Sequence, residues 1–426
     1  MVDSQGSSLG PWLYLPVEVK VRELDAKLLL AYHAINEGFR VVLGEHVAVE
    51  RVAKEGPPGI FFSKGYPDPY KSRVFKLVKR VGHRLVELDE EGLIIPNRKG
   101  YIESRMNQEF VDQLDHIYCW GRHQQGVITD AYPHVKTKTF LTGNPRFDLL
   151  KEKYRRLYHP RVHKIREEYG DFLLINTRFA VYNQVRRQQK HDDSDLYRYM
   201  KKLFSSFIEL IDYLSSQNPY QMIVIRPHPA ENVEVYKRHF NEQPNITIAP
   251  YGNVVDWILA SKLMIHNNCT TGIEAGLLGK PAISYKPISP SDFDDPLPSD
   301  FSIQATTLKD VQETVANIQE NPNHPSLTIR QLNLLNYHVS GWTATDAYQH
   351  LINSLKEIPI KNNSTLDLSS TKRKRRKNRN AKYRFPRLTE REIRHFFNKL
   401  EQIEGKQSRI NTHAIDRNVF ILTSKG

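Results

Sequence analysis

Two apolar segments near the middle of the chain constrain the fold most, because each ends abruptly in a polar turn. Met222 to Ile225 is a short apolar run rich in β-branched residues, the pattern of a strand buried on both faces of a parallel sheet. It ends at Arg226-Pro227-His228-Pro229, where two prolines prevent a regular continuation. Leu263 to Ile265 has the same character and leads into the polar turn from His266 to Gly272, with a helix expected from Ile273 to Leu278. Since open α/β sheets bind ligands at the carboxyl ends of their strands, we expect a ligand site at both turns.

The residue types at these turns suit an anion. Arg226 offers a fork of donors, and a helix capped by Thr270 or Thr271 would present unpaired amides. Glu274 could accept hydrogen bonds from a ribose, or it is a first-turn acid that suits the helix dipole. His228 and His266 could each be structural instead. We therefore predict a nucleotide-phosphate site with these candidates: Arg178, Arg226, His228, Glu231, His266, Asn268, Thr270, Thr271, Gly272 and Glu274.

The segments RPHPAE and HNNCTTGIEAGLLGKPAISY resemble the C-terminal half of GT-B glycosyltransferases that build bacterial surface polysaccharides. The resemblance covers roughly residues 12 to 355 and extends, more distantly, to capsule Kdo transferases and CDP-glycerol glycerophosphotransferases. It implies that His228 contacts the donor phosphate and that Glu274 holds the donor ribose. The His-Pro motif also suggests a CMP-linked ulosonic acid as donor. No DxD-like pair of acids occupies a suitable loop, so we expect neither a metal nor another cofactor.

The first third of the chain predicts a second parallel sheet. Apolar strands alternate with helical segments, the first of which ends at Gly38, and this order is typical of βαβ units. The side chains just beyond the first and third strands are candidates for acceptor binding, or solvated loop residues: Glu18, Arg22, Glu23 and Lys64. The expected strands are Pro11–Pro16, Phe39–Gly44, Gly59–Phe62, Arg84–Leu88, Asp115–Trp120 and Thr139–Leu141.

Three successive acids follow the strand at Arg84–Leu88. Asp89, Glu90 and Glu91 would repel one another, which raises a carboxyl pKa and favours a general base that takes a proton from a sugar hydroxyl. A solvated acidic turn is the alternative. A DEEG turn occupies this place in the resembling family, and we take Glu90 and Glu91 as the leading candidates.

The chain is expected to form two Rossmann-like domains of GT-B type and a tail. The turn TGNPRFD suggests a hinge, so we predict an acceptor domain at 1–148 and a donor domain at 149–357. The donor domain is expected to contain the second sheet of the chain, which begins with the strand Phe172–Ile175. The final helix, Thr343 to Leu355, is expected to cross back onto the first domain. Residues 358–426 are predicted to be a basic, largely disordered tail with one amphipathic helix at Arg391–Gln402.

Charge and cysteine content bear on location. Ten of the cations lie between Lys372 and Arg387 without an acid, which leaves about +3 of the formal +13 for the rest of the chain. The near-neutral remainder argues against nucleic acid as a partner of the folded domains, and an anionic membrane surface suits the basic run. Neither a membrane span nor a signal peptide is evident, and there are two cysteines. We expect a cytoplasmic protein that is peripheral at the inner membrane face.

These patterns favour a glycosyltransferase that uses a nucleotide-activated sugar and a glycan or lipid-linked acceptor. Two alternatives use the same architecture: a polyol-phosphate transferase of the CDP-glycerol type and a sugar-nucleotide epimerase. A basic-tailed protein that binds membrane or nucleic acid is the non-enzymatic alternative.

Overall fold

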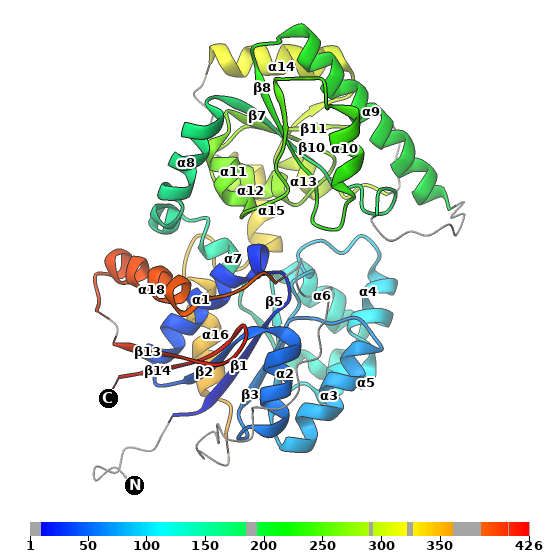
Figure 1. Ribbon diagram of the computed structural model, residues 1–426. Coiled ribbons are helices and arrows are strands. Elements are labelled where there is room, and N and C mark those ends of the chain that lie inside the picture. The colour runs from blue at the N-terminus through cyan, green and yellow to red at the C-terminus, as the bar shows by residue number, and fades with distance from the viewer. Residues whose placement is uncertain are drawn as a thin grey trace. The chain divides into compact units, whose positions relative to one another are not determined.

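A computed structural model describes residues 10–184, 194–288, 293–321, 327–360, 385–407 and 409–425. The chain forms two compact units. Figure 1 colours the chain by residue number, so unit 1 contains the blue and cyan elements together with the orange and red ones. Unit 1 comprises Met1–Leu149 and Leu335–Gly426, and unit 2 comprises Leu150–Leu334. The first boundary lies one residue from the expected position. The boundary expected at residue 357 is wrong, because the chain returns to unit 1 at Leu335 and unit 2 is therefore inserted between two parts of unit 1.

Unit 1 contains an eight-stranded sheet in the order β13-β14-β2-β1-β3-β4-β5-β6. The six strands that precede unit 2 are parallel and lie within one residue of the expected ranges: β1 (Trp12–Val17), β2 (Arg40–Glu45), β3 (Ile60–Ser63), β4 (Arg84–Leu88), β5 (His116–Cys119) and β6 (Thr139–Leu141). The helices between them are α1 (Lys20–Asn36), α2 (His46–Glu55), α3 (Tyr70–Val81), α4 (Arg98–Arg105), α5 (Gln108–Gln113) and α6 (Arg122–Ala131), and α7 (Pro145–Asp148) follows β6.

Both faces of this sheet are buried, as its continuous apolar strands require. One face packs Tyr14, Phe61 and Leu85 against residues of α2, α3, α5 and α6. On the other face, α16 (Ala347–Lys356) packs against α1. The carboxylate of Asp148 fixes the start of α16, because it accepts hydrogen bonds from the backbone of Ala347 and Tyr348 at 2.9 and 3.0 Å. The predicted return of this helix to the first domain is confirmed.

The C-terminal segment is part of unit 1. Helix α18 (Glu390–Glu404) confirms the expected amphipathic helix and buries Ile393, Phe396, Phe397 and Leu400. Strands β13 (Ile410–Asp416) and β14 (Val419–Ser424) form a hairpin, and β14 pairs antiparallel with β2 (Figure 1). The prediction of a largely disordered tail is thus wrong for these residues, since β14 supplies the partner that the edge of β2 needs. The basic run up to Arg384 lies outside the described residues.

Unit 2 contains a six-stranded parallel sheet in the order β12-β11-β10-β7-β8-β9. Its strands are β7 (Phe172–Asn176), β8 (Met222–Arg226), β9 (Ile246–Ile248), β10 (Leu263–His266), β11 (Ala282–Tyr285) and β12 (Ile303–Ala305). Its helices are α8 (His159–Tyr169), α9 (Asp195–Gln217), α10 (Val233–His239), α11 (Val254–Ala260), α12 (Thr271–Leu277), α13 (Pro296–Asp300) and α14 (Leu308–Glu320), and α15 (Ile329–His338) returns the chain to unit 1.

Helices cover both faces of this second sheet as well. Side chains of α9, α10 and α14 share a core with Ile175, Ile225 and Ile265, while α8 packs against α11 (Figure 1). Within the described ranges, no helix is long and apolar enough to cross a bilayer.

Candidate functional site

The sheet of unit 2 brings three strand ends together. Asn176 at the end of β7 lies level with Arg226 of β8 on one side and His266 of β10 on the other. From β7 the chain first winds to β8 and β9, and it later adds β10 and β11 on the opposite side. Winding therefore changes direction between β7 and β10, and such a switch point is where open α/β sheets bind ligands.

Arg226 is a buried cation with an unsatisfied donor. Its Nη2 donates to the carbonyl oxygen of Gly252 at 2.7 Å, whereas its buried Nε has no hydrogen-bond acceptor among the described residues. Burial lowers the pKa of Arg226 to about 10, and the nearby carboxylate of Glu274 opposes that shift. The guanidinium remains charged at neutral pH. A desolvated cation with an unused N–H is suited to an anionic oxygen.

Asn268, in the turn after β10, is a second residue at this edge with an unsatisfied polar side chain. Its φ of 52° lies in the left-handed region, and its buried side-chain oxygen and nitrogen have no hydrogen-bond partner within the described ranges. The neighbouring Asn267 differs, because its amide accepts from the backbone N–H of Arg178 at 2.7 Å and donates to the carbonyl of Arg178 at 3.2 Å. Unsatisfied buried polar groups are rare, so Asn268 is a candidate ligand contact.

Two further cations follow neighbouring strands. Arg178 lies two residues beyond β7, and Lys286 is the first residue after β11. Both are partly exposed, and both lower the pKa of His266 in addition to the larger effect of burial. Lys286 is not among the residues predicted from the sequence. Its position directly after the apolar strand Ala282–Tyr285 is the signal that would have identified it.

The Glu231 carboxylate connects the turns after β7 and β8 through hydrogen bonds. Its carboxylate accepts hydrogen bonds from the Thr177 hydroxyl at 3.1 Å, the Phe179 amide at 2.9 Å, the His228 amide at 3.1 Å and the Tyr236 hydroxyl at 2.6 Å. These protein donors occupy it, so the predicted contact between Glu231 and a donor is not supported. Its role is to hold the turn that contains His228 beside the turn after β7.

His266 is a structural residue. It is fully buried, which lowers its pKa to about 3, and its Nδ1 accepts from the Cys269 amide at 3.1 Å. Its Nε2 therefore carries the proton and donates to the Ser302 hydroxyl at 2.8 Å. A Cβ on Gly272 would lie 2.5 Å from this Nε2, so Gly272 is required for packing against the ring. These contacts within the protein do not support the predicted ligand role of His266, and they give Gly272 a packing role.

The expected threonine caps are wrong. Thr270 makes no side-chain cap hydrogen bond to α12, which has seven residues. The Thr271 hydroxyl instead accepts from the Asn176 amide at 2.8 Å. The candidate anion contacts at this edge are therefore side chains and not a capped helix end.

Unit 1 has a switch point of its own. The chain winds from β1 to β2 on one side and then places β3 on the other side of β1. Glu18 and Lys64 follow β1 and β3, and their Oε2 and Nζ atoms are 2.7 Å apart. Glu23 accepts hydrogen bonds from the backbone of Glu18 at 2.8 Å and of Val19 at 3.3 Å. Glu23 therefore shapes the turn after β1, whereas Lys64 and Glu18 form an ion pair at the strand ends.

Each acid after β4 has a cation of its own. The distances are 2.8 Å for Asp89 and Arg105, 3.0 Å for Glu90 and Lys27, and 2.7 Å for Glu91 and Arg22. The expectation that repulsion raises the pKa of the leading candidates is wrong. Burial raises the pKa of Glu90, and partial burial raises that of Glu91, but the neighbouring cations hold both below the ordinary value.

Asp89 behaves differently from the two glutamates. Burial raises its pKa to about 6 against the opposing effect of Arg105, and its Oδ2 has no hydrogen-bond partner in the part of the chain that the structure describes. Its side chain is fully buried, whereas the Glu91 side chain is 51% exposed. Glu90 is nearly as buried, with 5% of its side chain exposed, so all three acids stay candidates for a base, with Glu90 and Glu91 as the leading pair.

Lys27 is also absent from the residues predicted from the sequence. It lies within the apolar segment Ala26–Leu30 of α1 and its side chain is 5% exposed. A lysine inside an apolar helical stripe was the available signal.

A second polar cluster, also missed, adjoins the end of β2. The Tyr70 hydroxyl donates to Glu50 at 2.7 Å, and burial raises the pKa of Glu50 to about 7. Glu45 lies close to His46, with 3.3 Å between Oε1 and Nε2.

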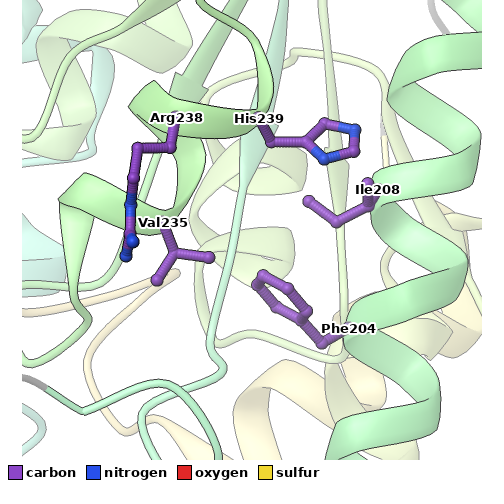
Figure 2. A pocket seen from close by; sticks show the side chains of 5 residues that line it. All are labelled: Phe204, Ile208, Val235, Arg238 and His239. Atoms are coloured by element: carbon purple, nitrogen blue, oxygen red, sulfur yellow. The ribbon is translucent and has the colours of Figure 1, made fainter.

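A surface hollow of about 320 Å³ lies between α9 and α10. Figure 2 shows Phe204 and Ile208 of α9 facing Val235 and His239 of α10, with Arg238 beside them. Among the described residues, no group of three or more His, Cys, Asp or Glu side chains is arranged to hold a metal ion.

No protein-family model matches the sequence, and no curated protein matches it. Solved structures do match. The UDP-GlcNAc 2-epimerase of Methanocaldococcus jannaschii, in complex with UDP-GlcNAc and UDP, gives a TM-score of 0.52 at 12% identity over 81% of this chain and 99% of that chain. Another UDP-N-acetylglucosamine 2-epimerase gives 0.51 at 11% identity over 82% and 95%. The wall teichoic acid polymerase TagF gives 0.41 at 11% identity over 70% and 71%.

At these identities the likeness concerns the fold. The protein is an α/β protein with two Rossmann-like units and a GT-B-like fold, as the sequence predicted.

Proposed function

We propose that the protein is a glycosyltransferase that moves a sugar from a nucleotide-activated donor to a hydroxyl of a surface glycan or lipid-linked glycan. Unit 2 binds the donor nucleotide and unit 1 binds the acceptor. The observation that carries the proposal is the pair of unsatisfied buried polar side chains at one strand edge, Arg226 and Asn268.

Arg226, Arg178 and Lys286 give the donor edge three cations at neighbouring strand ends, which suits the phosphates of a nucleotide. Positive groups fixed before reaction stabilise the charge that develops on a leaving phosphate. His228 and Glu274 complete the edge in the roles that the resemblance gives them, at the phosphate and the ribose.

In unit 1, Glu90 or Glu91 accepts the proton of the acceptor hydroxyl. The hydroxyl oxygen forms a bond to the anomeric carbon of the donor sugar. The bond between that carbon and the donor phosphate breaks, and its electron pair leaves with the nucleotide. Lys64 and Arg22 lie at the same strand ends and are suited to hydrogen bonds with the acceptor glycan.

Calorimetry with UDP, GDP, CDP and CMP tests the donor site. Asn268→Gly removes the side-chain amide while it keeps the positive φ, and we expect it to weaken binding of the cognate nucleotide at least tenfold, about 1.4 kcal/mol. Lys237→Ala is the control, because Lys237 is an exposed partner of Glu234 on α10. Unchanged affinity in Asn268→Gly would exclude this site.

Product analysis separates the transferase from its alternatives. The protein is incubated with UDP-, GDP- and CDP-activated sugars, CDP-glycerol and a CMP-linked ulosonic acid, with and without acceptor glycans. We expect nucleotide release that requires an acceptor and adds a sugar to it. A new sugar nucleotide formed without acceptor would indicate the epimerase, and transfer of a phosphoalcohol would indicate the polyol-phosphate transferase.

We further propose a cytoplasmic location with attachment to an anionic membrane through the basic run. Truncation cannot test this, because α18 and β14 belong to unit 1. In the test, the seven Lys and Arg residues from Lys372 to Arg379 are replaced by Gln. The variant should lose flotation with anionic vesicles and retain its activity on a soluble acceptor. Equal flotation would contradict the membrane role.

A further inference from the structure

Lys27 of α1 forms a buried ion pair in the candidate acceptor site. Its Nζ is 3.0 Å from Glu90 Oε1, and both side chains are 5% exposed. It also lies 4.6 Å from the centre of the Phe62 ring. Burying two charges costs several kcal/mol per ion before the pairing is counted, so a buried pair is weak evidence for a role in stability. Its position at the strand edge that the proposed function assigns to the acceptor favours a role in chemistry.

The two oxygens of Glu90 have different surroundings. Oε1 is held by Lys27, whereas Oε2 has looser neighbours, the Asn144 amide at 3.5 Å and the Arg146 guanidinium at 3.9 Å. A carboxylate that is fixed through one oxygen can direct the other toward a hydroxyl proton without losing its orientation.

Charged groups from several elements act on this carboxylate. Arg22, Glu23 and Lys27 belong to α1, Lys64 follows β3, and Arg146 belongs to α7. Lys27 is the cation nearest to Glu90, which makes it the largest single contribution to keeping the carboxyl group charged.

We propose that Lys27 is a positioning residue, which holds Glu90 ionised and oriented so that Oε2 takes the proton of the acceptor hydroxyl. This inference rests on the proposed function. In the step, the proton of the hydroxyl moves to Glu90 Oε2 while the hydroxyl oxygen bonds to the anomeric carbon, and the bond from that carbon to the donor phosphate breaks with its electrons on the nucleotide. Lys27 keeps its own proton throughout.

A matched control exists in the same unit. Lys71 and Glu87 also form a buried ion pair, at 2.6 Å with both side chains fully buried, and a hydroxyl from Ser63 satisfies the second carboxylate oxygen. Lys71→Met therefore removes the same type of charge from a pair whose second carboxylate oxygen accepts a short hydrogen bond of 2.6 Å. Lys27→Met is the test variant, and Lys27→Arg keeps the charge.

The first measurement does not depend on activity. Carbon-13 labelling of glutamate side chains follows the titration of Glu90, assigned with Glu90→Gln. We expect the pKa of Glu90 to rise by at least about one unit in Lys27→Met, to stay near the parent value in Lys27→Arg, and to be unchanged in Lys71→Met. If Lys27→Met does not fold, Lys27→Gln replaces it, since its amide can still donate to Oε1.

The second measurement is the dependence of kcat/KM on pH. Because a general base works when it is deprotonated, the acidic limb should move upward in Lys27→Met by the same interval as the titration of Glu90 and should not move in Lys71→Met. A merely structural role for Lys27 would lower the amount of active protein without moving this limb. An unshifted Glu90 titration, or a shifted titration with an unmoved acidic limb, would overturn the inference. If no donor supports turnover in the parent protein, the proposed function fails, and the titration still decides whether Lys27 controls Glu90.

Discussion

At the scale of single residues, buried carboxyl groups link the stability of unit 1 to pH. Burial raises the pKa of Asp89 to about 6 and that of Glu50 to about 7. A carboxyl group whose folded-state pKa lies above its unfolded value contributes stability that is fully present below the unfolded pKa. That contribution is lost as the pH rises through the folded-state value. For these two groups the loss falls between pH 4 and pH 7.

Glu50→Gln should therefore reduce the contribution of this carboxyl group to the pH dependence of the free energy of unfolding. Buried histidines such as His266 act in the opposite direction, so the expectation concerns the difference between variant and parent. We expect the change in the free energy of unfolding from pH 5 to pH 8 to be less negative, or more positive, in the variant than in the parent by up to about 3 kcal/mol, the free energy of a shift of roughly two pKa units. Urea unfolding at the two pH values measures it. Glu103→Gln, which changes an exposed acid on α4, is the control. The same change from pH 5 to pH 8 in Glu50→Gln and the parent would contradict this account.

Two glycines of α12 provide a matched test of packing. Gly272→Ala places a Cβ 2.5 Å from His266 Nε2, whereas the nearest atom to a Cβ on Gly276 lies at 3.4 Å, in the ring of Phe301. We expect Gly272→Ala to lower the free energy of unfolding by about 2 kcal/mol, as overpacking does, and Gly276→Ala to change it by less than about 1 kcal/mol. Thermal unfolding checks both. Equal effects of the two substitutions on the free energy of unfolding would show that the His266 ring shifts to accommodate the added Cβ.

At the scale of elements, the C-terminal helix and hairpin complete unit 1. Helix α18 packs on α1, where the rings of Tyr32 and Phe397 are 5.8 Å apart. Strand β14 pairs with β2, and the Leu388 amide donates to the Asn418 side chain at 2.8 Å, next to the turn of the hairpin. The segment after the basic run is thus an integral layer of the unit.

Phe397→Ala should destabilise the protein strongly. Its ring is 4% exposed, and truncation of a buried phenylalanine costs about 3 kcal/mol or more because it leaves a cavity. Arg391→Ala, at an exposed position of the same helix, should change the free energy of unfolding by less than about 0.5 kcal/mol. Denaturant unfolding provides the comparison. Similar small effects in both variants would show that α18 contributes little to unit 1.

At the scale of the whole molecule, the chain enters unit 2 at Leu150 and leaves it at Leu334, so each unit has its own sheet and its own core. A nucleotide that binds at the strand edge of unit 2 stabilises the native form of that unit, by about 2.7 kcal/mol at a hundredfold excess over Kd.

Hydrogen exchange with mass spectrometry should therefore detect binding locally. We expect the cognate nucleotide to slow exchange in peptides that contain the ends of β7, β8 and β10, and to slow exchange in β1 to β6 less. The same experiment on Asn268→Gly at equal nucleotide concentration is the control. Stronger protection in unit 1 than in unit 2 would contradict the proposal that the nucleotide binds to unit 2.

The sequence by itself determined the strands, the class of fold and the edges where polar residues gather. Strands buried on both faces produce continuous apolar runs, and these local patterns identify β1 to β8 and β10 within one residue. Pro227 and Pro229 likewise mark the end of β8 in the sequence alone.

Only the tertiary structure decided which polar residues are open to a ligand. His266 and Glu231 resemble site residues in sequence, but in the fold they form hydrogen bonds with Ser302 and Tyr236. Gly272 also resembles a site residue, but it lies against the His266 ring. The cation that holds Glu90 comes from Lys27, 63 positions earlier in the chain, and β14 pairs with a strand hundreds of residues before it. A local pattern reports burial, whereas ion pairs and strand partners depend on contacts between distant parts of the chain.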